Sequence, residues 1–63
     1  MFKLIVFNPA HADRPLVIRV ELASEVLELV PRLLLDHADC ERIEVHDARG
    51  KLFSVDCASN RPA

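Results

Sequence analysis

The sequence predicts an α+β fold in which two β-hairpins form a four-stranded sheet and one proline-kinked helix packs on a single face, in the order ββαββ. Three observations predict this fold. Apolar and polar residues alternate along several short segments, which is typical of half-buried strands. One longer segment in the middle of the chain repeats its apolar residues at helical spacing. The chain has 63 residues, enough for one small domain and too few for two.

The first hairpin is expected from two segments near the start of the chain. Phe2–Phe7 contains three consecutive aliphatic residues, as a buried strand does. Asn8-Pro9 ends this strand, and a polar loop follows as far as Pro15. Residues 16–22 then alternate, so that Leu16, Ile18, Val20 and Leu22 share one side of a second strand.

The helix is expected to begin at Ser24, an N-cap residue followed by acidic residues that suit the positive end of a helix. Its apolar arc contains Val26, Leu27, Leu29, Val30, Leu33 and Leu34. Pro31 lies inside this pattern, and because proline has no N–H we expect a kink there. Leu35 falls outside the arc and is expected to face solvent or a partner.

The second hairpin is expected to follow at residues 41–47 and 51–57. Asp47-Ala48-Arg49-Gly50 fits a type I turn with Gly50 left-handed, which gives a three-residue loop. This loop pairs Val45 with Phe53, Ile43 with Val55, Glu44 with Ser54, His46 with Leu52, and Glu41 with Cys57. The single domain is expected to span residues 1–57, with residues 58–63 as a frayed tail.

The order of the strands follows from connection rules. A right-handed crossover through the helix makes the second and third strands run in the same direction. The first strand is the most apolar, so we expect it in the centre of the sheet. An order of second, first, fourth and third strand satisfies both conditions.

One helix covers only one face of such a sheet, and the uncovered side is called the open face below. The predicted alternation leaves four large apolar residues there, with Arg19 and His46 at their rim: Ile5, Phe7, Val17 and Leu52. A cluster of this kind indicates a partner. The sequence therefore predicts a protein-interaction module, possessing no enzymatic activity, that forms a homodimer through the open face or an edge strand, as an adaptor or regulator. The alternative is that the four residues are scattered and shielded by the stems of Arg19 and Lys3.

A second hypothesis, from a different functional class, rests on His37, Cys40 and Cys57. The predicted helix and hairpin bring these residues to one end of the domain, with Glu41 nearby as a fourth candidate ligand. They suit either a metal site or a redox-responsive disulfide. The alternative is that both cysteines are small buried apolar residues and that His37 interacts with the helix dipole.

Other functional classes are disfavoured by composition. Eight basic and ten acidic residues give a formal charge of −2, and the basic residues are spread along the sequence, so no nucleic-acid partner is expected. A single glycine leaves no phosphate-binding loop, and neither a catalytic triad nor a cofactor is expected. The apolar segments are too short for a signal peptide or a membrane span, and two cysteines make no disulfide framework, so we expect the cytoplasm.

The stretch from Cys40 to Phe53 resembles the closing hairpin of short uncharacterised bacterial proteins with a β-β-α-β-β plan. In those proteins a helix rich in Ala and Leu precedes an acidic and apolar strand and a turn. His46 stands where an aromatic residue is expected in them. The resemblance implies the same fold and no activity, because such families have none assigned.

Overall fold

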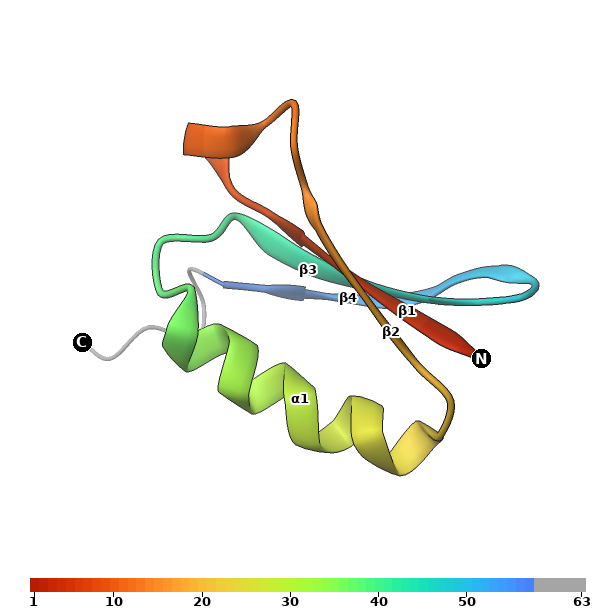
Figure 1. Ribbon diagram of the computed structural model, residues 1–63. Helices are drawn as coiled ribbons and strands as arrows, with labels where there is room; N and C mark the ends of the chain where they lie inside the picture. Colours follow the sequence, from red (N-terminus) through yellow and green to blue (C-terminus); the bar gives the residue numbers. More distant parts are fainter. Residues whose placement is uncertain (58–63) are drawn as a thin grey trace.

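The computed structural model describes residues 1–57 and has the predicted ββαββ fold (Figure 1). Its elements are β1 (Phe2–Phe7), the 3₁₀ helix η1 (Pro9–His11), β2 (Leu16–Val20), α1 (Ala23–Asp36), β3 (Arg42–Asp47) and β4 (Gly50–Asp56). Helix α1 lies against one face of the sheet, and no element covers the other face of the described strands. The tail predicted at residues 58–63 lies outside the described residues.

The strands are ordered β2-β1-β3-β4, and every neighbouring pair is antiparallel. The central position of β1 is confirmed, and β2 and β3 run in the same direction on either side of it. The predicted neighbour of β1 was wrong, since β3 and not β4 takes that place. The reason is visible in burial: Ile43 and Val45 of β3 are completely buried, whereas most of β4 is exposed.

Helix α1 begins at Ala23, with Leu22 as its N-cap, so the prediction of Ser24 as N-cap was wrong. The Glu25 N–H donates to the Leu22 carbonyl at 3.1 Å, and no side chain caps the first turn. The helix continues through Pro31 for 14 residues without being split, and the kink expected at Pro31 stays a prediction.

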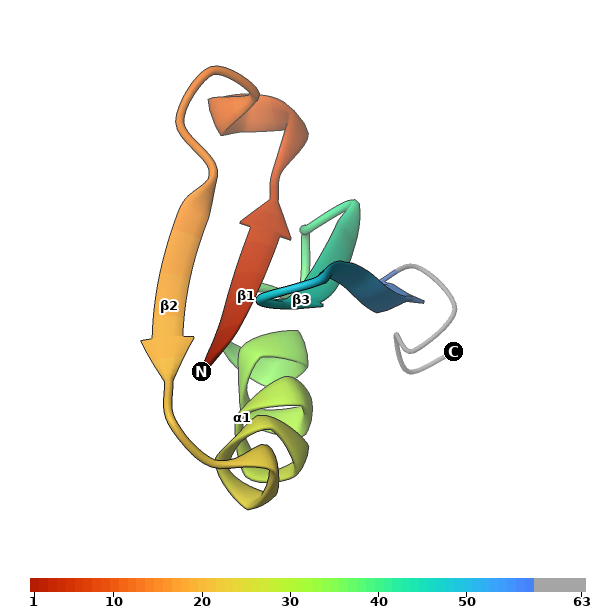
Figure 2. The same ribbon diagram turned by 90° about the vertical axis from the view of Figure 1, so that its right-hand side faces the viewer.

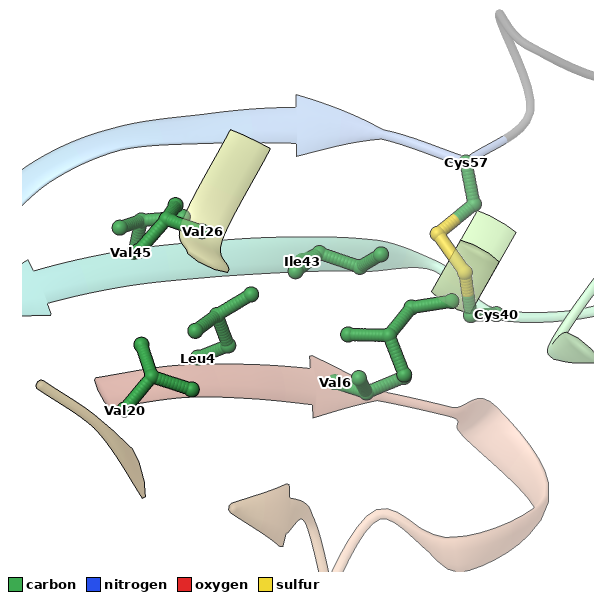
Figure 3. Packing of buried hydrophobic residues seen from close by; sticks show 9 residues of the cluster. Leu4, Val6, Val20, Val26, Cys40, Ile43, Val45 and Cys57 are labelled. Atoms are coloured by element: carbon green, nitrogen blue, oxygen red, sulfur yellow. A yellow bond between two sulfur atoms is a disulfide. The ribbon is translucent and has the colours of Figure 1, made fainter. Parts of the chain in front are cut away.

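The hydrophobic core lies between α1 and the sheet (Figure 3). Val26 and Leu33 are the fully buried residues of the helix. They pack with residues of the sheet and with two cysteines: Leu4, Val6, Val20, Ile43, Val45, Cys40 and Cys57. Small and medium side chains predominate in this core, which suits the short distance between one helix and one sheet.

The β3–β4 hairpin differs from its predicted register at the turn. Asp47 pairs with Gly50, so the loop has two residues and not three. The Arg49 N–H donates to Asp47 Oδ1 at 2.8 Å, and Gly50 has a φ of +128°, which favours glycine. The predicted pairs Val45–Phe53, Ile43–Val55 and Glu44–Ser54 are nevertheless confirmed farther along the strands.

A β-bulge explains how the loop can be one residue shorter than predicted while these pairs stay the same. His46 pairs with Lys51 and Val45 with Phe53, so Leu52 is the extra residue of β4. The predicted pair of His46 and Leu52 was therefore wrong. Lys51 takes the place beside His46 on the open face, and Leu52 lies on the helix side with Phe53.

The helix covers the sheet unevenly. It lies against β1 and β2, while β4 extends beyond it on the far side of β3 (Figure 2). Phe53 points to the helix side of the sheet, yet it is 42% exposed. The sheet therefore has an uncovered strip along β4 on the face that the helix was expected to cover.

Candidate functional site

The predicted open-face residues separate into two groups in the structure. Ile5 and Val17 are cross-strand partners on the open face, and Phe7 lies there two residues farther along β1. Arg19 and His46 flank the same face as the sequence predicted. Leu52 does not belong to this group, because the bulge in β4 moves it to the helix side.

A polar network covers part of the open face over β3. Arg42 Nε donates to Glu44 Oε2 at 2.8 Å, and His46 Nε2 is hydrogen-bonded to Glu44 Oε1 at 2.9 Å. Arg42 also forms an ion pair with Glu41, and its guanidinium carbon lies 4.0 Å from the centroid of the Phe7 ring. A charged side chain thus covers Phe7, so the largest apolar residue of this face does not offer a bare surface.

The electrostatics of this network centre on Glu44. The hydrogen bond from Arg42 lowers the pKa of the Glu44 carboxyl, and the hydrogen bond to His46 lowers it further. The same bond to Glu44 raises the pKa of the Arg42 guanidinium. The carboxyl is therefore ionised at neutral pH and holds the two basic side chains on either side of it.

The exposed apolar surface gathers in a different place, between the first turns of α1 and the end of the β3–β4 hairpin. A cavity of about 170 Å³ opens there, and we call it the apolar groove. All of its lining residues are apolar: Phe2, Ala23, Val26, Leu27, Val45, Leu52 and Phe53. Leu27 and Leu52 on its two sides are 73% and 50% exposed.

The two cysteines form a disulfide that closes the opposite end of the core (Figure 3). Their Cα atoms are 5.7 Å apart, and both residues are buried. His37 is the C-cap of α1 and lies half-buried nearby in the sequence. In the bridged form neither sulfur is available as a thiolate ligand, and within residues 1–57 no group of three or more His, Cys, Asp or Glu side chains is arranged to hold a metal ion.

Comparison with protein-family models, with curated proteins and with solved structures finds no match for this chain. The functional assignment therefore depends on the surfaces described above. No helix among residues 1–57 has both the length and the apolar character needed to cross a membrane.

The apolar groove was not predicted from the sequence. Leu27 belongs to the predicted apolar arc of the helix and is nevertheless exposed, because α1 turns this side toward β4 and not toward the centre of the sheet. The bulge that places Leu52 in the apolar groove cannot be recognised from the alternation of apolar and polar residues in the sequence. Phe53 gave no signal either, because the predicted order placed its strand inside the sheet, and only the structure places β4 at the edge.

Proposed function

We propose that this protein is a small interaction module, without enzymatic activity of its own, that forms a homodimer through the apolar groove and the edge of β4. The observation that supports it best is the gathering of Leu27, Leu52 and Phe53, all exposed, beside an edge strand. Exposed apolar clusters of this kind mark sites of association. We propose the same role that the sequence predicts, namely an adaptor or a regulator.

The edge of β4 offers backbone groups for pairing. Strand β4 has seven residues, Gly50–Asp56, and is the last strand of the sheet on its side in the described part of the chain. Proteins usually protect such edges with charges, prolines or a covering element. Here the edge contains no proline and α1 does not extend over it, while the charged residues Lys51 and Asp56 and the bulge at Leu52 lie toward its ends.

A second copy of the chain fits this edge better than an unrelated strand. Antiparallel pairing of β4 with β4 of another copy has a twofold axis perpendicular to the sheet. Lys51 lies near one end of β4 and Asp56 near the other, so antiparallel pairing centred on the middle of β4 places no like charges of the two strands opposite one another.

The same symmetry joins the two apolar grooves. A twofold axis perpendicular to the sheet leaves both helices on the same side of a continuous eight-stranded sheet. Each groove then opens toward the other across the two β4 strands, and Leu27, Leu52 and Phe53 of the two copies fill the gap between the helices. Association thus covers the strip that α1 leaves uncovered.

The size of the cavities supports binding rather than catalysis. The apolar groove measures about 170 Å³, and a second pocket, on the open face, about 250 Å³. Sites that enclose small-molecule substrates usually measure roughly 300–1,000 Å³. Shallow surfaces of this kind suit a macromolecular partner.

Two leucines of α1 provide a matched test. Leu27→Glu places a charge in the apolar groove, whereas Leu35→Glu makes the same change at an equally exposed position of the same helix outside the groove. Burying a leucine contributes about 1.5 kcal/mol or more per copy, so we expect Leu27→Glu to weaken the dimer at least about 100-fold. Leu35→Glu is expected to leave it unchanged. Sedimentation equilibrium over a range of concentrations measures both constants.

Two results would contradict this assignment: a wild-type protein that stays monomeric at millimolar concentration, or equal weakening by both substitutions. Phe7→Asp tests whether the copies associate through the open face, which the sequence predicted as the interface, or through the apolar groove. If Phe7→Asp abolishes the dimer and Leu27→Glu does not, the copies associate through the open face and the groove is not the interface.

A further inference from the structure

The strand register brings four basic residues into one line across the open face. Lys3 lies directly opposite Arg19 on one side and His46 on the other, and His46 lies opposite Lys51. We call these four residues, one from each strand, the basic row. With strands about 4.8 Å apart, the row extends roughly 14 Å.

This arrangement is unfavourable for the sheet itself. Like charges directly opposite one another on neighbouring strands destabilise the pair. A protein with ten acidic residues and a net charge of −2 has enough carboxylates to neutralise them. Yet among the described residues no ion pair is formed by Lys3, Arg19 or Lys51.

Two carboxylates close to His46 in β3, those of Glu44 and Asp47, already make hydrogen bonds. Glu44 accepts hydrogen bonds from Arg42 and is bonded to His46, and it attracts Lys51 only through space. Asp47 Oδ1 accepts the Arg49 N–H in the β3–β4 turn. The row therefore retains positive charge that no side chain of residues 1–57 pairs directly.

A pocket of about 250 Å³ lies beside the row and includes three of its members. Lys3, Arg19 and His46 line it, together with Asp47, Ala48 and the apolar residues Met1 and Phe2. Lys3 and Arg19, which form no ion pair among the described residues, thus border an open depression with apolar walls. A ligand seated there meets both charge and apolar surface.

We propose that the basic row binds a linear polyanion whose charges are phosphate groups. A single phosphate contacts only two neighbouring strands, whereas a row of about 14 Å matches a chain of successive phosphates laid across the sheet. Lys3, Arg19 and Lys51 supply permanent charges, and His46 lies between Lys3 and Lys51 in the row. The sequence argued against such a ligand because its basic residues are far apart, and only the register brings them together.

The test compares two probes and two double variants. The probes are a fluorescein-labelled ten-nucleotide oligothymidylate, followed by anisotropy, and unlabelled inorganic polyphosphate as competitor. Lys3→Gln with Arg19→Gln removes two charges from the row and leaves β4 intact. Arg14→Gln with Arg32→Gln removes the same charge from the β1–β2 loop and from α1, away from the row.

Three phosphate contacts give a slope of about −2 for log Kobs against log salt, since each contributes about −0.7 on a single strand. We expect Lys3→Gln with Arg19→Gln to reduce the slope to about −0.7 and the affinity at 50 mM salt at least tenfold. The Arg14 and Arg32 double variant is expected to retain the wild-type slope. Because the slope counts contacts and not folded protein, it separates binding from any loss of stability, and circular dichroism verifies folding.

Displacement of the oligonucleotide by polyphosphate supports recognition of the phosphate chain alone. Binding of the oligonucleotide that polyphosphate fails to displace supports the same row with a nucleic acid as the source of the phosphates. Absence of binding at 50 mM salt up to 100 μM protein would overturn the inference. So would an equal loss of affinity and slope in the two double variants.

Discussion

Glu44 is the residue on which the polar side of the open face depends. Its side chain is only 14% exposed, and both of its carboxylate oxygens are hydrogen-bonded to basic partners. Its neighbour in β1 is Ile5, so the carboxylate stands at the border between the apolar and the polar half of this face. Neutralising Glu44 therefore leaves Arg42 with Glu41 as its remaining ion-pair partner and removes the carboxylate to which His46 is bonded.

A pH dependence of stability follows from this position. The pKa of Glu44 is lower in the folded protein than its ordinary value of 4.5, so its contribution to the free energy of unfolding is complete above about pH 4.5 and is lost as the pH falls through the folded value. Glu44→Gln removes the titrating group. We expect the melting temperature of Glu44→Gln to fall less than that of wild type between pH 5 and pH 3, as thermal circular dichroism measures. Glu28→Gln, on the outer side of α1, is the control. Parallel pH profiles for wild type and Glu44→Gln would contradict this role.

At the scale of the elements, the Cys40–Cys57 disulfide joins the loop after α1 to the end of β4. The two cysteines are 17 positions apart in the sequence, and the stretch between them contains the whole β3–β4 hairpin. The bond keeps the hairpin against the helix at the end where the Cys57 N–H donates to the Glu41 carbonyl. The bridged form belongs to an oxidising environment, because cytoplasmic thiols stay reduced. The cytoplasm remains a prediction, and in that compartment the stability of the reduced form decides whether the fold persists.

Removing the bond measures its contribution. A loop of this length predicts a loss of about 3 kcal/mol in the free energy of unfolding, mainly through the unfolded chain. The double variant Cys40→Ala with Cys57→Ala is expected to show this loss in urea titrations, with a melting temperature about 15 °C lower. Wild type treated with dithiothreitol should approach the variant. If neither the variant nor reduction changes the unfolding midpoint, the disulfide does not stabilise the fold, and the redox-responsive hypothesis is wrong as well.

The elements and most cross-strand pairs could be predicted from the sequence, because alternation and helical spacing are local properties. Val45–Phe53 and Ile43–Val55 follow directly from the alternation. The place of Leu52 could not be predicted, because one bulged residue reverses a face and leaves the flanking pairs intact. The neighbour of β1 could not be predicted either, since it depends on which strand of the second hairpin, β3 or β4, buries more apolar surface against α1. To predict the basic row, both the bulge in β4 and the neighbour of β1 have to be known, so the row could be recognised only in the structure.

At the scale of the whole molecule, half of the residues are hydrophobic, yet a single 14-residue helix covers the sheet. Nine residues among those described form the buried core, and none is larger than leucine or isoleucine. Domains of this size bury only about 60% of the surface that their unfolded chains expose, so they are marginally stable alone. The apolar groove is the surface whose burial adds most to this core. Folding and association are therefore expected to be coupled.

That coupling predicts a melting temperature that depends on protein concentration. When a dimer unfolds to two chains, raising the concentration 100-fold favours the folded dimer by about 2.7 kcal/mol per dimer, so we expect a rise of about 5 °C or more. Leu27→Glu should abolish this dependence, and Leu35→Glu should keep it. Thermal circular dichroism at 5 μM and 500 μM measures the shift, with a shorter path length for the more concentrated sample. A wild-type melting temperature that does not change with concentration means that the core is sufficient by itself and that the exposed leucines beside β4 serve another partner.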